Sequence, residues 1–168
     1  MADMALAAFT MIDDFLANPD ELRESAPGLG YNRSSARENY PGITSDRPIA
    51  IKALDDFVSR AIGTPVFAAR GTLHGHCRIT LRVDRGRRGV HVDPAFYSGI
   101  LYLSRPEHAR GGTDFYRHRR TNLDKPPTTP EGVFRAGYSD LNLLIENVVN
   151  KYTHRPSALQ KTFTAPMR

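Results

Sequence analysis

The sequence predicts an α+β fold, a small antiparallel jelly roll (double-stranded β-helix) with helices packed on one side. Two features of the chain lead to this prediction. Helical patterns come early, and segments that alternate polar and apolar residues follow them, separated by glycine-rich turns. The 168 residues fit one domain, residues 1–168, and we find no internal repeat.

The first fifty residues are predicted to hold a strand, a short helix and a loop. Residues 7–16 are expected to form the strand. Asn18 is a good helix N-cap and Pro19 suits the first helical position, so a helix should run to about Ser25. Residues 28–48 are rich in Gly, Asn, Ser and Pro, which favours an ordered loop.

The middle of the chain changes from a helical period to a strand period. Apolar residues recur at helical spacing over residues 51–61, and Gly63 should end that helix. From Cys77 to Val83 every second side chain is apolar, which predicts a half-buried strand. Residues 85–89 should form the turn after it.

Three further extended segments are predicted beyond that turn. These are residues 90–93, the apolar strand 98–104, which is expected to be central, and the strand 113–118. Residues 121–132 contain three prolines and should form a loop. Ser139 or Asp140 can then cap a helix, and no clear period follows from residue 150 onward.

His91 and Asp93 are the residues whose chemistry stands out. Side chains two positions apart in an extended segment project to the same side, so this imidazole and carboxylate can meet. With a third ligand, such a pair suits Fe(II), Mn or Zn, and His154 is the candidate for that ligand. An aspartate before a proline also serves ordinary turns, which is the structural alternative for Asp93.

Two other histidine sites are weaker candidates. His74 and His76 could indicate a cupin-type metal site, but no glutamate follows at a suitable spacing, and a turn before the next strand is expected instead. His118 is followed by arginines and is expected to face solvent or an anion.

The charge of the chain narrows the classes of partner. The net charge is +5, and arginines concentrate between Arg78 and Arg120. A basic face can meet nucleic acid or an anionic small molecule. The chain has no tryptophan, no aromatic-rich sheet motif and no basic helix, so we expect a small anion or solvent rather than nucleic acid.

The cysteine content and the hydropathy of the chain indicate in which cellular compartment the protein is expected. The single cysteine, Cys77, excludes an intramolecular disulfide and a cysteine-rich zinc site. The first residues lack the basic region of a signal peptide, and no apolar run approaches the roughly 20 residues of a membrane span. We therefore expect a soluble, cytoplasmic protein that does not bind membranes.

The order of several short motifs resembles a known family. His91-Val92-Asp93 is followed by Ile100-Leu101-Tyr102-Leu103 and then by Gly111-Gly112-Thr113-Asp114-Phe115. This order looks like the core of prolyl-hydroxylase-type oxygenases that depend on 2-oxoglutarate and Fe(II). Residues 12–20 and 40–43 are similar to a group of small bacterial members, and the resemblance covers about residues 9 to 120.

The resemblance implies both a fold and an activity. The fold would be a double-stranded β-helix that holds Fe(II) through His91 and Asp93. The cofactors would be Fe(II) and 2-oxoglutarate, and the hydroxyl of Tyr102 would serve the far carboxylate of 2-oxoglutarate. Such a dioxygenase uses dioxygen to hydroxylate a C–H bond of a small molecule or of an amino-acid or peptide substrate. The alternative for Tyr102 is a core tyrosine on a buried strand.

The resemblance departs from the family pattern near the C-terminus. Lys151-Tyr152 resembles the start of the expected segment, but residues 153–157 differ from it. Either His154 is the third ligand in a shortened barrel, or the last strands of the barrel are missing from this sequence. Lys161 follows His154 at only seven residues, so no basic residue is assigned to 2-oxoglutarate. A non-catalytic jelly-roll binding protein with a degenerate metal site, whose basic face recognises an anion, is the alternative from another class.

Overall fold

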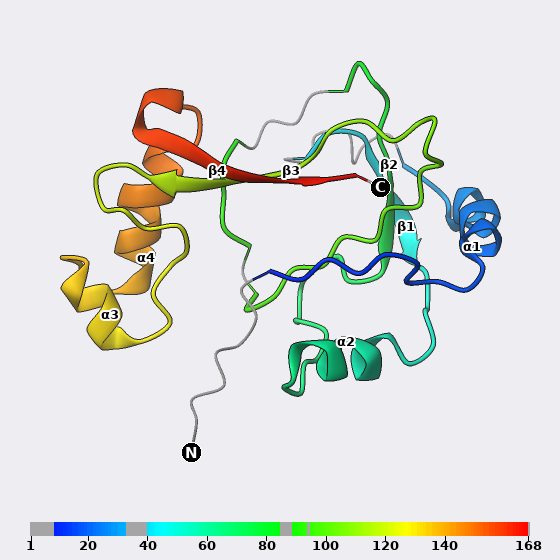
Figure 1. The fold of residues 1–168 in the computed structure, drawn as a ribbon, viewed down its shortest axis with the longest axis horizontal. Coiled ribbons are helices and arrows are strands. Elements are labelled where there is room, and N and C mark those ends of the chain that lie inside the picture. Colours follow the sequence, from blue (N-terminus) through cyan, green and yellow to red (C-terminus); the bar gives the residue numbers. More distant parts are fainter. Residues whose placement is uncertain (1–8, 33–39, 85–88, 94, 168) are drawn as a thin grey trace. The chain divides into compact units, whose positions relative to one another are not determined.

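The computed structural model describes residues 9–32, 40–84, 89–93 and 95–167 (Figure 1). The chain forms two compact units, Met1–Arg85 and Gly86–Arg168, and each is described by itself. Each unit combines short helices with one two-stranded antiparallel sheet. The described residues close no barrel, so the jelly roll stays a prediction, as does the single domain.

The helices of the first unit lie where the sequence predicts them. Helix α1 (Pro19–Ser25) begins after Asn18, whose side chain accepts a hydrogen bond from the backbone three residues on, at 3.4 Å. A 3-10 turn, η1 (Ala26–Leu29), continues it. Helix α2 (Leu54–Ile62) ends at Gly63, which has a φ of 81° and therefore adopts the left-handed conformation that glycine favours. These end signals are confirmed.

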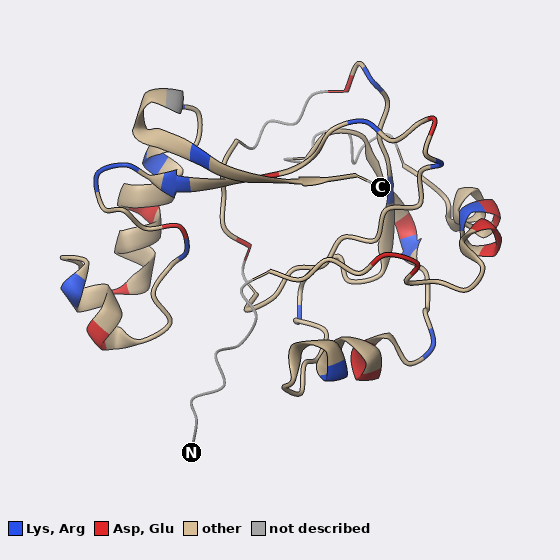
Figure 2. Ribbon diagram, in the orientation of Figure 1, with Lys and Arg blue, Asp and Glu red and all other residues tan. Residues whose placement is uncertain are grey.

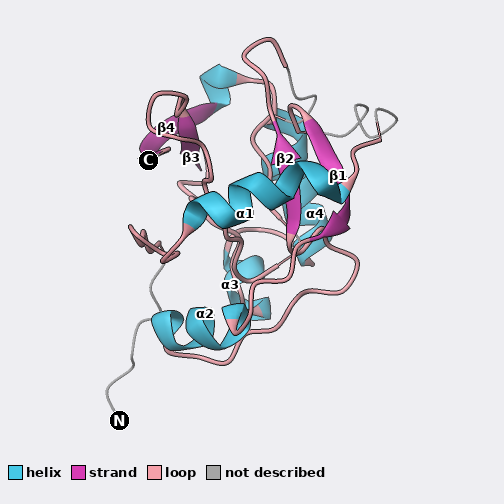
Figure 3. Cartoon of the chain, turned by 90° about the vertical axis from the view of Figure 1, so that its right-hand side faces the viewer, coloured by secondary structure: helices cyan, strands magenta, loops and turns pink. Residues whose placement is uncertain are grey.

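The sheet of the first unit pairs β1 (Ile43–Pro48) with β2 (His76–Ile79), which lie side by side in Figure 3. Ser45 on β1 is buried and hydrogen-bonds to two residues of β2. Its hydroxyl accepts a hydrogen bond from the backbone N–H of Cys77 at 3.0 Å, and its carbonyl lies 2.8 Å from Nδ1 of His76. Polar contacts, rather than an apolar face, therefore hold this sheet together.

Two predictions for the start of this unit are wrong. Residues 9–16 form no strand, and the remainder of the predicted strand 7–16 lies outside the described residues. Asp14 has a φ of 52°, a left-handed conformation that interrupts an extended chain. The predicted loop 28–48 contains β1 at its end, because residues 43–48 find a partner strand far along the chain.

The strand that forms in place of the predicted strand Cys77–Val83 is shorter than the alternating polar and apolar segment of the sequence. It ends at Ile79 because the next residues turn. The Asp84 carboxylate accepts the backbone N–H of Leu81 at 2.6 Å, and the Asp84 N–H donates to the Leu81 carbonyl at 3.0 Å. Val83 is consequently 77% exposed instead of half-buried.

The sheet of the second unit is a long ribbon of β3 (Gly112–His118) and β4 (Leu159–Pro166), visible in Figure 1. β3 confirms the strand predicted after the Gly-Gly pair. Gly112 is needed there, because a Cβ at this position would lie 2.0 Å from the carbonyl oxygen of Ala165 on the partner strand. β4 was not predicted.

Helices pack beside this ribbon's end. Helix α3 (Pro130–Arg135) begins inside the predicted loop 121–132, with Thr129 as its N-cap and Pro130 in the first turn. Helix α4 (Leu141–Leu144) is capped by Asp140, as predicted, at 2.9 Å from the backbone N–H of Leu143. Three further turns follow: η3 (Ile145–Val149, a π turn), η4 (Asn150–Tyr152) and η5 (Pro156–Ala158).

The core of the second unit is small and lies among these helices. Its buried residues are Val133, Leu144 and Val148, with Leu123, Ala136 and Tyr138 packed against them. No helix in the described part of the chain is both long and apolar enough to cross a bilayer.

The apolar segment 98–104, predicted as a central strand, forms no strand. Ile100 is 64% exposed, so its side chain does not enter a core. The predicted extended segment 90–93 is likewise assigned no strand, and residues 85–88 of the predicted turn lie outside the described residues. A segment rich in strand-forming residues becomes a strand only where another segment pairs with it, and residues 98–104 form no strand.

Candidate functional site

The segment 89–93, which carries the first two candidate metal ligands, is held by a residue far along the chain. The backbone N–H of Val90 donates to the carbonyl of Thr153 at 3.1 Å, and the Thr153 hydroxyl donates to the carbonyl of Val90 at 2.7 Å. Gly89 permits this approach, because a Cβ there would lie 2.1 Å from the Thr153 carbonyl oxygen. These two hydrogen bonds, which we call the clamp between Val90 and Thr153, hold the two segments in close contact.

His91 and Asp93 approach one another as their spacing predicts. Nε2 of His91 lies 3.4 Å from Oδ1 of Asp93. The side chains are 24% and 38% exposed, so the point where they meet is open to an ion from solvent. The other ring nitrogen of His91, Nδ1, lies 2.9 Å from the carbonyl oxygen of Gly89.

The contact with Gly89 determines which ring nitrogen of His91 carries a proton. A carbonyl oxygen only accepts, so Nδ1 must donate if this contact is a hydrogen bond. In the neutral imidazole, Nε2 then presents a lone pair toward the carboxylate of Asp93. A proton or a cation between two such acceptors would relieve their repulsion. Metal-bound histidines commonly donate their second N–H to a carbonyl in this way.

His154 lies against the same segment. Its Nδ1 is 2.8 Å from the place where a Cβ on Gly89 would stand, and its side chain is exposed. The three predicted ligands nevertheless do not gather into one cluster. In the described part of the chain, no three His, Cys, Asp or Glu side chains are grouped closely enough to hold a metal ion. The role of His154 as third ligand stays a prediction.

Tyr102 is half-buried and its hydroxyl is engaged. It lies 2.9 Å from Oγ1 of Thr113 on β3, and either oxygen can be the donor. The contact fixes the direction of the phenol. If Thr113 is the donor, the Tyr102 hydroxyl keeps its own proton for a further acceptor. Binding of 2-oxoglutarate by Tyr102 stays a prediction.

Lys161 has a partner of its own. Its Nζ lies 3.4 Å from both carboxylate oxygens of Asp114 across the β3–β4 ribbon. Asp114 also accepts the hydroxyl of Thr164 at 2.6 Å, and these hydrogen bonds lower the pKa of its carboxyl, the one from Thr164 most. The ammonium of Lys161 therefore forms an ion pair that joins β4 to β3.

His74 and His76 contact different partners. His76 bonds to Ser45 within the first unit's sheet, as described above. Nε2 of His74 lies 3.7 Å from Oδ1 of Asp55. The two rings have separate partners, as expected from a turn before a strand.

His118 is buried, so the expectation that it faces solvent is wrong, whereas the alternative that it faces an anion stays a prediction. Only 5% of its surface is exposed. Its Nδ1 lies 2.9 Å from Oγ1 of Thr121, and its ring stacks on Tyr152 with centroids 5.0 Å apart. Burial, and then the positive charge of Arg120, lower the pKa of this imidazole. The neutral form is thereby favoured.

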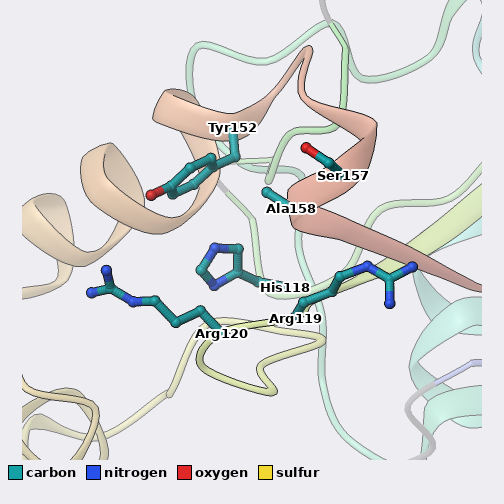
Figure 4. Close-up of a pocket in the computed structure, with 6 residues that line it drawn as sticks. All are labelled: His118, Arg119, Arg120, Tyr152, Ser157 and Ala158. Atoms are coloured by element: carbon teal, nitrogen blue, oxygen red, sulfur yellow. The ribbon is translucent and has the colours of Figure 1, made fainter.

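A pocket of about 370 Å³ opens beside His118 (Figure 4). Six residues line it: His118, Arg119, Arg120, Tyr152, Ser157 and Ala158. The two arginine side chains leave the backbone in opposite directions on either side of the imidazole, as Figure 4 shows. Figure 2 shows positive charge at the end of β3 and in the loop that follows.

The sequence did not predict this pocket, because the residues that line it are far apart along the chain. His118 and the arginines come from the end of β3, whereas Tyr152 and Ser157 come from turns before β4. The run of arginines after His118 was the available signal, and it indicated an anion. It did not indicate that a later aromatic ring would cover the histidine.

Comparison with family models finds one match. Residues 5–135 match a family of unknown function, DUF6445, a stretch that includes segments of both units. No curated protein and no solved structure matches the chain.

Proposed function

The chain belongs to the DUF6445 family, and we propose that it is a non-haem dioxygenase that depends on Fe(II) and 2-oxoglutarate. It would hydroxylate a C–H bond of a small molecule or of an amino-acid or peptide substrate. The observation that carries this proposal is the approach of Nε2 of His91 to Oδ1 of Asp93 at 3.4 Å, with Nδ1 held by a backbone carbonyl.

That distance suits two donors that share one cation. Two ligand atoms each about 2.1 Å from an ion, at a right angle, are about 3 Å apart. Imidazole and carboxylate donors without thiolate are the set that non-haem Fe(II) oxygenases use. The approach of Nε2 of His91 to the carboxylate of Asp93 therefore supports Fe(II) as the cation that these two residues would hold.

Each residue then has a defined task in the proposal. His91 and Asp93 would hold Fe(II). His154 would be the third ligand, next to Thr153, which is hydrogen-bonded to Val90. Tyr102, oriented by Thr113, would donate to 2-oxoglutarate. Bound Fe(II) with 2-oxoglutarate and dioxygen would supply the oxidising power for hydroxylation, with succinate as coproduct. The surrounding jelly roll belongs to the same proposal.

Anaerobic titration tests the metal site. Fe(II) added with 2-oxoglutarate should give a weak visible charge-transfer band in the wild type, and His91→Ala should abolish it. His108→Ala is the matched control, because His108 is an exposed histidine of the same unit and should leave the band unchanged. Absence of metal binding by the wild-type protein would refute the proposal.

A non-catalytic binding protein is the second candidate, and one observation favours it. The three predicted ligands do not form a cluster within the described residues, as a degenerate site would behave. Succinate formation separates the candidates. Turnover of 2-oxoglutarate above that of a metal-free control, without added substrate, excludes a purely binding role.

The remaining parts of the proposal concern location and partners. We place the protein in the cytoplasm, where the free thiol of Cys77 stays reduced. Nucleic acid is not among its proposed partners, and steep salt dependence of binding to any duplex or single strand would contradict this.

A further inference from the structure

We propose that the pocket between His118 and Tyr152 is a binding site for a phosphate group, carried by a small molecule or free in solution. This site is separate from the proposed metal site and does not depend on it. Its lining is basic, the nearby cations have no acidic partner among the described residues, and its volume suits a small ligand.

Positively charged side chains from two parts of the chain lie in the pocket or next to its Tyr152. Arg119 and Arg120 line it from the end of β3. Nζ of Lys151 and the guanidinium carbon of Arg155 lie 5.7 Å and 5.9 Å from the centroid of the Tyr152 ring. Two arginines thus line the pocket, two further cations approach the ring of Tyr152, which also lines it, and no lining residue is acidic.

These cations are not neutralised within the described part of the chain. The nearby acid Asp124 lies 3.3 Å from Arg117, which is a different arginine. No ion pair joins a described carboxylate to Arg119, Arg120, Lys151 or Arg155. A cluster of like charges without counter-charges is unfavourable by itself, and a bound anion relieves the repulsion.

The lining groups suit phosphate better than a monoanion. A phosphate monoester carries a charge near −2 at neutral pH and offers three acceptor oxygens. Guanidinium groups bind such oxygens through paired N–H donors, and Ser157 adds a hydroxyl. Thr121 can donate or accept at Nδ1 of His118, so the imidazole can carry its proton on Nε2 and provide a further donor.

The pocket's size favours a small ligand over a polynucleotide. Its volume of about 370 Å³ lies at the lower end of the range for small-molecule sites. Both cations nearest Tyr152 approach its ring, which His118 also stacks against, so the ring is not a free platform for a base. Polynucleotide binding would need such platforms in succession.

Titration calorimetry without added metal tests this proposal, with inorganic phosphate and glycerol phosphate as separate probes. Saturable binding of either is expected, and tighter binding of the ester would identify an esterified ligand. Arg120→Gln should weaken binding about tenfold or more, because one charged donor pair is lost. Arg119 is the poorer choice for substitution, because its Nε also donates to the Leu159 carbonyl at 3.2 Å.

Arg110→Gln is the matched control. It removes the same charge from an exposed position of the same unit, outside the pocket. Equal weakening by both variants would show a general field effect and overturn the assignment. No saturable binding, displacement of phosphate by equimolar succinate, or affinity for oligonucleotides that grows with their length would each overturn it as well.

Discussion

His91 and His118 belong to the same unit, but they meet surroundings of opposite charge. His91 is partly exposed and directs Nε2 at the carboxylate of Asp93. His118 is buried against Tyr152, with Arg119 and Arg120 beside it. An imidazole next to a carboxylate favours a cation, whereas one among arginines stays neutral and favours an anion. The residue type is the same, and the neighbours determine which ligand we propose for each site.

The largest expected effect concerns the backbone that holds His91. Gly89→Ala places a Cβ 2.1 Å from the Thr153 carbonyl, so the two segments must separate and lose their paired hydrogen bonds. We expect the free energy of unfolding to fall by about 3 kcal/mol and Fe(II) binding to be lost. Denaturant unfolding and metal titration measure these effects.

Gly99→Ala is the control for that experiment. A Cβ at Gly99 meets no atom within 4 Å, so stability should change by less than about 0.5 kcal/mol. Similar losses in both variants would show that the clamp is not what orders the segment.

The two histidines should differ in their contribution to stability. His118→Ala removes a hydrogen bond and a ring contact of a buried side chain, each worth about 1 kcal/mol, so about 2 kcal/mol should be lost. His91→Ala, at a partly exposed position, should change the free energy of unfolding by less than about 0.5 kcal/mol. Equal losses would mean that His91 has a structural role, which would weaken the contrast between the sites.

The pH dependence of stability should come in part from His118. Burial and Arg120 lower its pKa in the folded protein, so the unfolded chain takes up the proton first as the pH falls below about 6.5. The unfolded state is then favoured, and stability present above that pH is lost. Unfolding midpoints at about pH 7.5 and about pH 5.5 should differ less in His118→Gln than in the wild type. An unchanged difference would contradict this origin.

The smallest effect is expected at Lys161, which belongs to neither site. Its contact with Asp114 is an exposed ion pair, so Lys161→Gln should cost less than about 1 kcal/mol. Binding of phosphate and of Fe(II) with 2-oxoglutarate should both remain unchanged, as calorimetry and the visible band would show. A marked loss of 2-oxoglutarate binding would assign Lys161 to the cosubstrate.

Local signals in the sequence predicted local structure. Asn18 and Asp140 mark helix starts because their side chains bond to backbone N–H groups three residues away. Gly63 marks a helix end through its own φ. The approach of His91 to Asp93 followed from a spacing of two residues. In each case the partner lies within a few positions of the signal.

Structure that depends on distant partners was predicted poorly. Strand β4 pairs with β3 across a long stretch of chain, and its mixed polar composition gives little sign of a strand. The segment 98–104 shows the converse. Its composition is typical of a strand, but it has no partner strand in the described residues. The arginines beside His118 predicted that it faces solvent or an anion. They did not predict its burial, because Tyr152, whose ring it contacts, comes much later in the sequence.

The clamp between Val90 and Thr153 joins positions 63 residues apart. Closing so long a loop costs conformational entropy before any contact compensates for it, and contacts of this range slow folding. During synthesis, the segment that carries His91 cannot adopt its final geometry until residue 153 has left the ribosome. Assembly of the proposed cation site is thereby among the late events in the maturation of this chain.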